Sequence, residues 1–471
     1  MALAQHILNI FNVIVIVYFF MGNGAYTILM FVAAGGAFVN NRRLDYQSME
    51  DMRDSRAMPP LTVIIPAHNE EDSIIETVLS VIQADYPDMQ IVVVDDGSHD
   101  STLDRLVLEF RLHPTPLIYR AELPTGRVSA FLVGDDVPNL LVISKEHGGK
   151  ADALNTGINS CRTPYFCTLD ADSLVEPDSL LRLMRPIVRS PHNTIVSGGT
   201  IRIRNGCKTL RARVEEPRMP STWIERFQVV EYLRSFLFGR AGWNLIGGTM
   251  IVSGAMAVFH RQHVIDAGGF SSATVGEDIE LIVRLKRHAR KQREKVAITF
   301  SFDPVCWTQC PSSYAMLVRQ RRRWQVGLCQ TLWLNLGMLF NPRYGVLGLC
   351  SFPFHLCVEG LGAAVEITGY FVVPVAFALH LALLKFYIPF VIFSLVYASL
   401  LSVAAILLEE LTFRRYPRRH DLYLLLASAM IDNFGFRQRI LYYRVQGFIR
   451  FIAGIHHWEN VSHSSADRGR L

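Results

Sequence analysis

Residues 7 to 38 are almost wholly uncharged, and this stretch limits what the chain can fold into. A membrane-spanning helix needs about 20 apolar residues. The stretch is therefore either one long tilted helix or a span followed by an interfacial turn at Gly22-Asn23-Gly24. A secretory signal fits less well, because no basic region precedes the apolar run and the run is too long. We expect residues 1–40 to form an N-terminal transmembrane helix.

A second apolar region begins beyond Pro342. We expect transmembrane helices over residues 346–410, with two crossings near 348–370 and 386–408. Glu359 and Glu366 interrupt the first of these, and because a charge in lipid is costly we expect them to face a polar passage. Half of the 471 residues are hydrophobic, more than a soluble domain of this size needs. The chain is therefore predicted to be an integral membrane protein.

Clusters of arginine predict the orientation in the membrane, because basic residues favour the cytoplasmic side. They follow the first apolar stretch at Arg42 and Arg43, and the last one at Arg414, Arg415, Arg418 and Arg419. The N-terminus is then outside and the intervening domain cytoplasmic. Residues 41–57 read as a linker, 411–455 as a cytoplasmic or interfacial helical region in which a further crossing is an alternative, and 456–471 as a polar tail. In that tail, the adjacent His456 and His457 do not predict a metal site.

The stretch Tyr165–Asp172 carries the strongest chemical pattern in the cytoplasmic part. Apolar residues 165–169 predict a buried strand, which ends in Asp170-Ala171-Asp172. Side chains alternate along an extended chain, so Asp170 and Asp172 should project from the same side. Paired carboxylates suit Mg²⁺ or Mn²⁺, which neutralises a diphosphate. An acidic turn without a ligand is the alternative when this pattern is taken alone.

Two further apolar strands, at 61–66 and 90–96, also end in polar residues, and helical patterns over 70–84 and 101–110 alternate with them. This βαβ order predicts a mainly parallel sheet with its ligand at the carboxyl ends of the strands. Lys150 opens a predicted helix after Gly148-Gly149, where the helix start favours an anion. Residues 113–146 look like a hairpin.

A helix is predicted over Trp223–Arg240. It could lie on the membrane or against the sheet, and packing against the sheet is slightly favoured.

Charge and cysteine content argue against a nucleic-acid-binding protein and against a zinc site. The net charge of +5 is small and clustered, with no aromatic and basic interleaving, so nucleic acid is not an expected partner. The eight cysteines lack the paired spacing of a zinc site, and we interpret them as reduced thiols. Membrane lipids and a nucleotide diphosphate are the expected partners.

Six motifs in order resemble the processive family 2 glycosyltransferases, such as poly-N-acetylglucosamine, hyaluronan, chitin and cellulose synthases. The resemblance covers residues 58 to 335 and the membrane helices that follow. The motifs are Pro66-Ala67-His68-Asn69-Glu70, Asp95-Asp96-Gly97-Ser98, Gly149-Lys150-Ala151-x-Ala153-Leu154-Asn155, Asp170-x-Asp172, Gly276-Glu277-Asp278 and Gln320-x-x-Arg323-Trp324.

This resemblance implies a cytoplasmic GT-A catalytic domain at 58–312, interfacial helices at 313–345, and membrane helices that form a channel. It implies a UDP-sugar donor, a polysaccharide or lipid-linked acceptor, inversion at the sugar carbon, and the plasma membrane of a bacterium as location. An accessory membrane subunit is among the partners that it allows. The implied donor-binding residues are Pro66, Ala67, Asn69, Glu70, Asp95, Asp96, Lys150, Asp170, Gln320 and Arg323. The implied metal ligands are Asp172 and Asp170, and the catalytic pair is Asp278, the base, with Glu277.

The residues themselves agree with these roles. Transfer of a sugar needs a base for the acceptor hydroxyl and stabilisation of the departing diphosphate, although Glu277-Asp278 could merely cap a helix. Gln320, Arg323 and Trp324 share one helix face, where the guanidinium suits diphosphate oxygens and the indole suits an acceptor sugar. The alternative is a basic interfacial helix, and we expect Arg321 and Arg322 to face lipid. Ser253 and Gly254 lie in a predicted strand at 251–259, at a small-residue bulge where an acceptor can approach.

Three functions remain open on the sequence. The leading one is a processive polysaccharide synthase, and the second is a transferase of single sugars to a lipid-linked acceptor. A catalytically silent nucleotide-binding membrane scaffold is the third, disfavoured by the intact Asp170, Asp172 and Asp278. The sugar is not readable from the sequence, with a slight preference for N-acetylglucosamine over glucose.

Overall fold

The computed structural model describes residues 2–44, 58–117, 119–379 and 384–455. These residues divide into two compact units. The sheet unit comprises the described parts of 39–218 and 249–311, and the helical unit those of 1–38, 219–248 and 312–459. Most of the linker predicted at 41–57 and the tail predicted at 456–471 lie outside the described residues. The predicted catalytic domain, 58–312, thus includes one segment, 219–248, that clusters with the helices.

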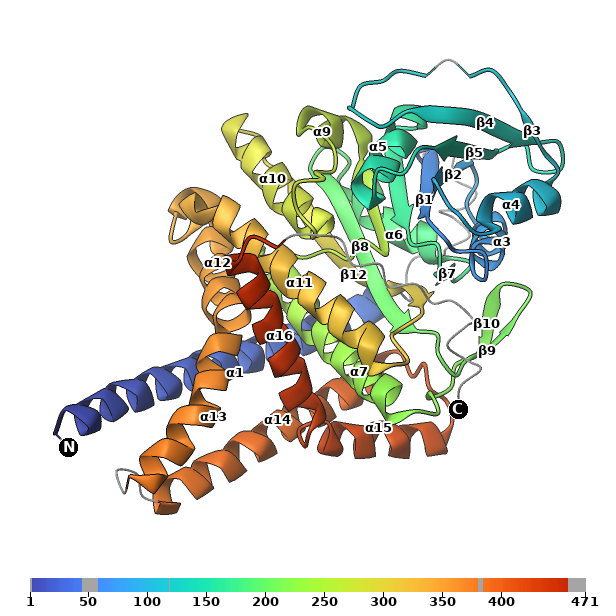
Figure 1. The fold of residues 1–471 in the computed structure, drawn as a ribbon. Coiled ribbons are helices and arrows are strands. Elements are labelled where there is room, and N and C mark those ends of the chain that lie inside the picture. The colour runs from blue at the N-terminus through green and yellow to red at the C-terminus, as the bar shows by residue number, and fades with distance from the viewer. Residues whose placement is uncertain (1, 45–57, 118, 380–383, 456–471) are drawn as a thin grey trace. The chain divides into compact units, whose positions relative to one another are not determined.

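The described residues of the sheet unit contain a mixed sheet of ten strands, in the order β3-β4-β5-β2-β1-β6-β11-β8-β12-β7 (Figure 1). Strands β5, β2, β1 and β6 run parallel to one another, as the βαβ pattern predicts. Strand β11 is antiparallel to both of its neighbours. The strands are β1 Leu61–Ala67, β2 Met89–Asp96, β3 Leu112–Pro114, β4 Val128–Gly134, β5 Leu140–Lys145, β6 Tyr165–Leu169, β7 Leu174–Val175, β8 Thr194–Ile203, β11 Met256–His260 and β12 Ala297–Thr308, with β9 Lys208–Leu210 and β10 Arg213–Glu216 forming a separate hairpin.

Helices flank this sheet and bury its apolar side chains. One buried cluster joins β1, β2 and β6 to α5, α9 and α10. Gly157 of α5 lets that helix approach β1, because a Cβ at this position would lie 2.4 Å from Ile64 Cγ2. The antiparallel pairing of β4 with β5 confirms the predicted hairpin. The helices of this unit are α3 Ile74–Ile82, α4 Thr102–Phe110, α5 Lys150–Ser160, α6 Ser179–Arg189, α9 Arg261–Asp266 and α10 Glu277–Lys291.

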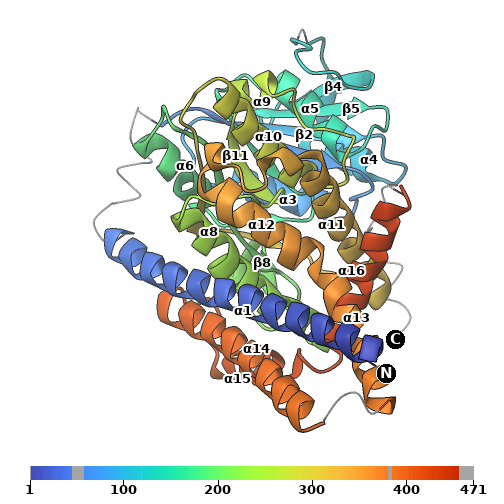
Figure 2. The ribbon, with the colours of Figure 1, turned by 90° about the vertical axis from the view of Figure 1, so that its left-hand side faces the viewer.

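The first apolar stretch is one continuous helix, α1 Ala2–Leu44, without a break at Gly22-Asn23-Gly24. It runs beside α14, where the rings of Phe19 and Phe390 lie 5.1 Å apart (Figure 2). The other elements of the helical unit are α7 Trp223–Leu233, the π-helical η1 Arg234–Arg240, α8 Ala241–Leu245, α11 Tyr314–Leu334, η2 Leu336–Met338, η3 Pro342–Tyr344, η4 Leu347–Ser351, α12 Phe352–Phe354, η5 His355–Gly360, α13 Gly362–Ala378, α14 Leu384–Thr412, α15 Arg419–Ile431 and α16 Phe436–Ile452.

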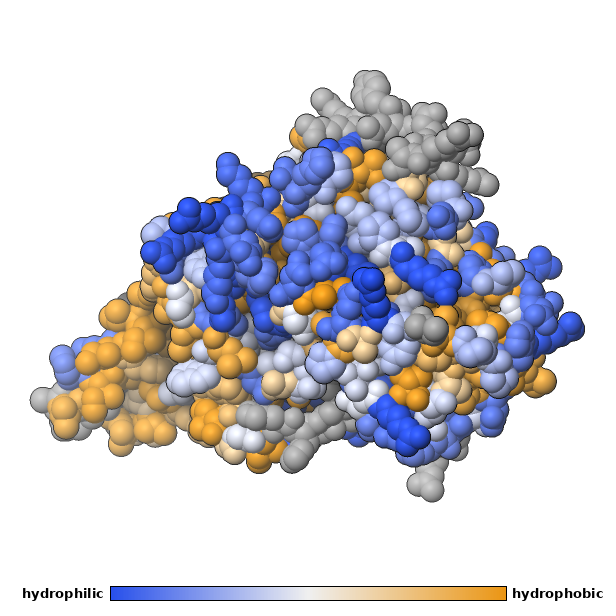
Figure 3. Space-filling model, turned by 90° about the horizontal axis from the view of Figure 1, so that it is seen from above, coloured by the Kyte–Doolittle hydropathy of each residue, from blue (hydrophilic) through white to orange (hydrophobic). Residues whose placement is uncertain are grey.

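Three segments among the described residues are long and apolar enough to cross a membrane: Gln5–Val39, Leu347–Ala378 and Tyr387–Thr412. They match the predicted N-terminal span and the two crossings predicted beyond residue 346. Apolar side chains, drawn in orange, gather over the part of the helical unit that projects at the left of Figure 1 (Figure 3). Exposed apolar residues of α1 include Ile7, Val13 and Phe20. The protein is a membrane protein.

The two glutamates in the second span have polar partners. Glu359 Oε2 lies 3.2 Å from Arg444 Nη2 of α16, and the same carboxylate accepts a hydrogen bond from the Tyr26 hydroxyl of α1. The Tyr18 hydroxyl donates to Glu366 Oε1 at 2.6 Å. These contacts offset the cost of placing carboxylates among membrane helices. Whether they line a passage stays a prediction.

The helix predicted over Trp223–Arg240 packs against α14 and α15 of the helical unit. It forms α7 and then widens into η1. Its buried residues Ile224 and Phe227 contact Leu317 of α11 and Phe436 of α16. Other helices of this unit bury its apolar side, and packing against the sheet stays a prediction.

Candidate active site

The carboxyl ends of the parallel strands bring the predicted polar residues to one edge of the sheet. In the register of the strands, Ala67 of β1 lies opposite Asp95 of β2, and Asp96 lies opposite Lys145 of β5. Strand β6 ends at Leu169, directly before Asp170. This edge is where parallel sheets with crossover helices bind their ligands.

Lys150 joins three parts of the chain at this edge. Its Nζ lies 2.5 Å from Asp170 Oδ1 and 3.8 Å from Glu277 Oε1. Burial opposes the charge of Lys150, but the carboxylates of Asp170, Glu277 and Asp278 outweigh it and raise the pKa of the lysine above its ordinary value. The start of α5, the end of β6 and the start of α10 therefore meet around one positive charge.

Asp278 is held in place by backbone donors. Its Oδ2 accepts the N–H of Gly254 at 3.1 Å, and its Oδ1 accepts the N–H of Ile279 at 2.8 Å. A Cβ at Gly254 would lie 3.3 Å from both Cβ and Oδ2 of Asp278, so a glycine permits this approach. Ser253 and Gly254 do not continue β11, which begins at Met256 and not at 251 as predicted. Their backbone instead turns toward the carboxylate.

Asp172 and Glu70 bring two further carboxyl groups. Asp172 Oδ1 accepts hydrogen bonds from the hydroxyls of Ser173 at 3.1 Å and Thr308 at 3.0 Å. Burial, together with the charges of Asp172 and Asp170, raises the pKa of Glu70 to about 8, although the Ser73 hydroxyl opposes this. Carboxylates that suppress one another's ionisation in this way fit a divalent cation, which would relieve the repulsion.

Asp96 shapes the loop that leads to Lys150. Its carboxylate accepts hydrogen bonds from the buried Lys145 Nζ at 2.7 Å and from the N–H groups of Gly148 and Gly149 at 2.9 and 2.7 Å. Lys145 also lies 2.5 Å from Asp152 Oδ2. The sequence analysis missed Lys145 and Asp152. A lysine that ends an apolar strand, directly after a neighbouring strand ending in aspartate, was the pattern that could have revealed the pair.

Asp95 and Asn69 lie beside this loop. Asp95 is buried, which raises its pKa, while hydrogen bonds from Ser98 oppose that shift. Asn69 has a left-handed backbone, with φ of 58°. Its N–H donates to Ser98 Oγ at 3.0 Å and its side-chain oxygen accepts from the N–H of His99 at 2.8 Å. The motif that begins at Pro66 and Ala67, at the end of β1, is thus tied to the loop after β2.

Gln320, Arg323 and Trp324 belong to α11 of the helical unit. Trp324 is 42% exposed, while Gln320 and Arg323 are partly buried. The prediction that Arg321 faces lipid was wrong. Its side chain is buried, forms two hydrogen bonds with Glu231 of α7 at 2.8 and 2.9 Å, and stacks 4.3 Å over the Trp324 ring. A guanidinium between a carboxylate and an indole fixes the orientation of that indole.

All eight cysteines lie among the described residues, and none forms a disulfide. Burial raises the pKa of Cys167 to about 12, and the pKa of Cys306 is also raised by burial. Thiols of this kind are not reactive nucleophiles. Reduced cysteines stay a prediction.

A mixed, mostly parallel sheet with carboxylates at its carboxyl edge, joined in one chain to apolar helices, defines a membrane-associated GT-A glycosyltransferase. The model of the glycosyl transferase family group 2 matches residues 165–408, just over half of the chain, and that of glycosyl transferase family 2 matches residues 62–118. The chain belongs to glycosyl transferase family group 2. The resemblance to family 2 is confirmed.

Curated relatives include the poly-beta-1,6-N-acetyl-D-glucosamine synthases of Staphylococcus aureus strain MSSA476 and of Staphylococcus epidermidis. The first is 27% identical over 269 residues, which are 57% of this chain and 54% of the relative. The second is 25% identical over 270 residues, with the same coverage. The chain spans about half the length of the curated relatives it matches. A solved mannosyltransferase, PcManGT from Pyrobaculum calidifontis in complex with GDP-Man and Mn²⁺, is 19% identical, with a TM-score of 0.48, covering 88% of this chain and 99% of that one.

Proposed function

We propose that this protein transfers a sugar from a UDP-sugar to a growing polysaccharide, with inversion at the sugar carbon and repeated addition to the same chain. The observation that carries the proposal is the convergence of Lys150, Asp170, Glu277 and Asp278 at one sheet edge. The name of the curated relatives supports a polysaccharide product and favours UDP-N-acetylglucosamine as donor. Uridine diphosphate then leaves as the acceptor oxygen bonds to the sugar carbon.

Asp278 is the proposed base. Two backbone N–H groups fix its carboxylate, which leaves it able to accept the proton of an acceptor hydroxyl as that oxygen attacks. With Asp278 as the base, the acceptor oxygen can attack the sugar carbon directly, and such a single displacement inverts that carbon. The carboxylate of Glu277 lies near the ammonium group of Lys150, and this ion pair positions the start of α10.

Lys150 and the loop before it are proposed to hold the donor. The lysine supplies positive charge where the diphosphate develops negative charge. Asp95 is the proposed nucleotide contact at the end of β2, with Pro66 and Ala67 at the end of β1 and Asn69 and Glu70 in the loop that follows. Asp96 is saturated by donors of this chain, so we assign it to the shape of the Gly148-Gly149 loop.

Asp172 and Asp170 are the proposed ligands of Mg²⁺ or Mn²⁺. Burial, together with the charges of Asp172 and Asp170, raises the pKa of nearby Glu70, and carboxyl groups gathered in this way fit a cation. When bound, the cation would supply charge that stabilises the diphosphate leaving group. Lys150 pairs with one oxygen of Asp170, so Asp172 is the proposed main ligand of the ion.

Trp324 is the proposed acceptor platform, with Ser253 and Gly254 as acceptor contacts near the base. The exposed face of Trp324 can stack on a sugar ring. The guanidinium of Arg321 lies over the indole of Trp324 and fixes its orientation. Gln320 and Arg323 are proposed to reach diphosphate oxygens. The membrane helices would carry the product outward. In this proposal the sheet unit is cytoplasmic, the membrane is a bacterial plasma membrane, and the N-terminus lies outside it.

The test incubates the full-length protein, purified in detergent, with a panel of radiolabelled UDP-sugars and sizes the product. Long chains from one UDP-sugar, with the anomeric configuration of the linkage opposite to that of the donor, are the expected result. A single sugar on an extracted lipid would favour the second candidate, a non-processive transferase. Binding of UDP without any transfer would support the nucleotide-binding scaffold.

A further inference from the structure

A buried glutamine directly follows Trp324 on α11, and the reaction proposed above does not use it. The side chain of Gln325 belongs to a residue that is only 3% exposed. A buried amide left without hydrogen bonds costs roughly 1–3 kcal/mol, so its partners indicate what it does. These partners belong to two other parts of the helical unit, the apolar span Leu347–Ala378 and the helix α16.

Gln325 joins α11 to the apolar span. Its Nε2 donates to the carbonyl oxygen of Gly360 at 3.1 Å and also lies 3.4 Å from that of Glu359. Gly360 is the last residue of η5, and α13 begins at Gly362. Carbonyl groups at a helix end need partners from outside the helix. The amide of Gln325 supplies one, so α11 is bonded to the backbone of the span at this junction.

Arg444 of α16 completes the network. Its Nε donates to Gln325 Oε1 at 3.0 Å, and its Nη2 donates to the carbonyl oxygen of Glu359 and to Oε2 of the same residue, the latter at 3.2 Å. One planar guanidinium therefore binds α11 and the apolar span at the same time. Helix α16 also lies directly on α11, since a Cβ at Gly447 would lie 2.8 Å from Gln325 Cβ and 2.9 Å from the carbonyl oxygen of Arg322.

Two separate sets of contacts thus determine where the indole of Trp324 lies. Arg321 lies over the ring and fixes its orientation on the helix. Gln325 and Arg444 fix the helix itself. Apolar packing alone would allow α11 to slide along the span, because apolar contacts are not directional. Hydrogen bonds to two backbone carbonyl groups resist such sliding, because they weaken steeply when their geometry changes.

We propose that Gln325 and Arg444 are positioning residues that hold α11 at one place along the apolar span and so keep Trp324 in register for the acceptor. This inference rests on the proposed function, in which Trp324 binds the growing chain. Loss of either residue leaves the donor contacts intact and loosens Trp324. The growing chain then dissociates after fewer additions, and the product becomes shorter.

The first test measures the environment of Trp324 without any reaction. The full-length protein in detergent is titrated with acrylamide, and quenching of Trp324 is the difference between each protein and the same protein carrying Trp324→Phe. The variants are Gln325→Leu and Arg444→Met, which remove the polar groups and keep most of the side-chain volume. The matched control is Arg439→Met, which alters an exposed arginine of the same α16 that lies over the Tyr314 ring.

Quenching of Trp324 should increase in both variants and stay unchanged in the control. The indole is 42% exposed, so local opening can raise its quenching constant by up to about twofold. Arg444→Lys keeps a positive charge beside Glu359 and should recover the melting temperature. Its quenching should stay raised, because one ammonium group lacks the planar fork that reaches Gln325 and Glu359 together. Wild-type quenching in the folded Gln325→Leu and Arg444→Met proteins would overturn the positioning role.

The second test sizes the labelled polysaccharide after equal consumption of UDP-sugar. Gln325→Leu and Arg444→Met should give shorter chains, with UDP affinity unchanged because neither residue is among the proposed donor contacts. Chains of wild-type length would overturn the inference, and so would a parallel loss of UDP affinity, which indicates a general loss of folding. If the wild-type protein transfers no sugar at all, the proposed function fails, while the quenching measurement still decides whether the two residues fix Trp324.

Discussion

Lys150 Nζ lies 2.5 Å from Asp170 Oδ1, although the two residues belong to different motifs, one opening α5 and the other following β6. The pair lies within reach of Glu277, at the start of α10. A positive charge between the proposed cation ligands and the proposed base links the two halves of the reaction: departure of the diphosphate and activation of the acceptor.

Replacing Lys150 with Met should weaken UDP binding. A charge-assisted hydrogen bond contributes roughly 1.5–3 kcal/mol, so the dissociation constant measured by calorimetry should rise at least about tenfold. Lys208→Met changes an exposed lysine of β9 and serves as the control. Unchanged affinity in Lys150→Met would remove the lysine from the donor site.

Replacing Asp278 with Asn should abolish transfer and spare the donor site. The amide keeps the size of the side chain but cannot take a proton, so kcat should fall by roughly 10²–10⁴. UDP affinity should change less than about twofold, because the proposed donor contacts remain. Asp266→Asn, at the exposed end of α9, is the matched control. Wild-type activity in Asp278→Asn would assign the base to another residue.

Removing divalent cations should stop the reaction. Chelation should eliminate incorporation of labelled sugar, and Mg²⁺ or Mn²⁺ should restore it. In Asp172→Asn, the cation concentration needed for half-maximal activity should rise at least about tenfold, since one charged ligand is lost. Full activity in chelator would show that Lys150 and its neighbours suffice without a metal.

Replacing Asp96 with Asn should reduce stability, because it breaks a buried ion pair with Lys145. Loss of one partner of such a pair costs on the order of 3 kcal/mol, which thermal unfolding followed by tryptophan fluorescence would report as a lower melting temperature. Asp136→Asn breaks the exposed pair with Arg111 and should cost less than about 1 kcal/mol. Equal effects of the two variants would contradict a structural role for Asp96.

Lys286 on α10 should make stability depend on pH. Burial, with a contribution from Arg290, lowers its pKa to about 8 from the ordinary 10.5. Between these values the unfolded chain binds more protons, so the stability contributed by this residue rises as pH increases from about 8 to 10.5. Lys286→Met should therefore raise the melting temperature at pH 7 and lose most of that advantage near pH 10.5. The exposed Lys291→Met should show no such trend.

The candidate site residues were predictable where a local pattern carries the chemistry. Asp170 and Asp172 follow a strand that is apolar enough to recognise, and Lys150 follows a glycine pair that can only open a helix or a loop. Lys145 was not predictable in this way. Its partners are Asp96, placed by the pairing of β2 with β5, and Asp152, placed by the start of α5. Arg321 was misread for the same reason, since Glu231 lies on a helix that is remote in sequence.

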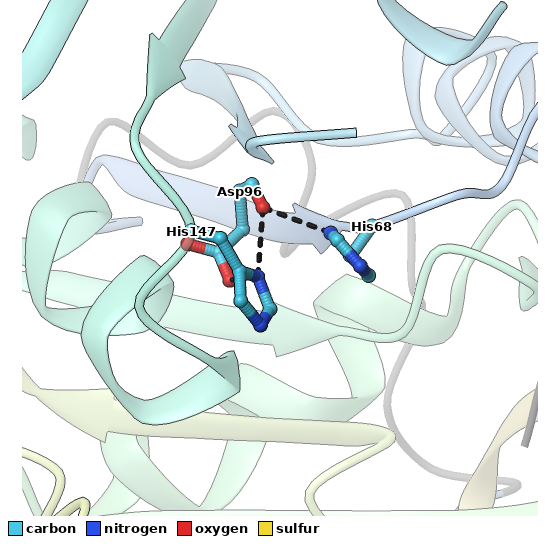
Figure 4. Close-up of side chains that lie close together, drawn as sticks. All are labelled: His68, Asp96 and His147. Carbon is cyan, nitrogen blue, oxygen red and sulfur yellow. Dashed lines mark hydrogen bonds and ion pairs between the residues drawn. The ribbon is translucent and has the colours of Figure 1, made fainter. Parts of the chain in front are cut away.

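The three apolar spans, the alternation of strands and helices, and the residue types at the strand ends were predictable from the residues alone, because hydrophobic length and periodicity are local properties. Three other features became visible only in the folded protein: Asp96 holds its own loop, 219–248 packs among helices, and His68 and His147 share the backbone carbonyl of Asp96 (Figure 4). These are contacts between side chains and backbone from distant segments, and they are set by strand register and helix packing, which no local pattern records.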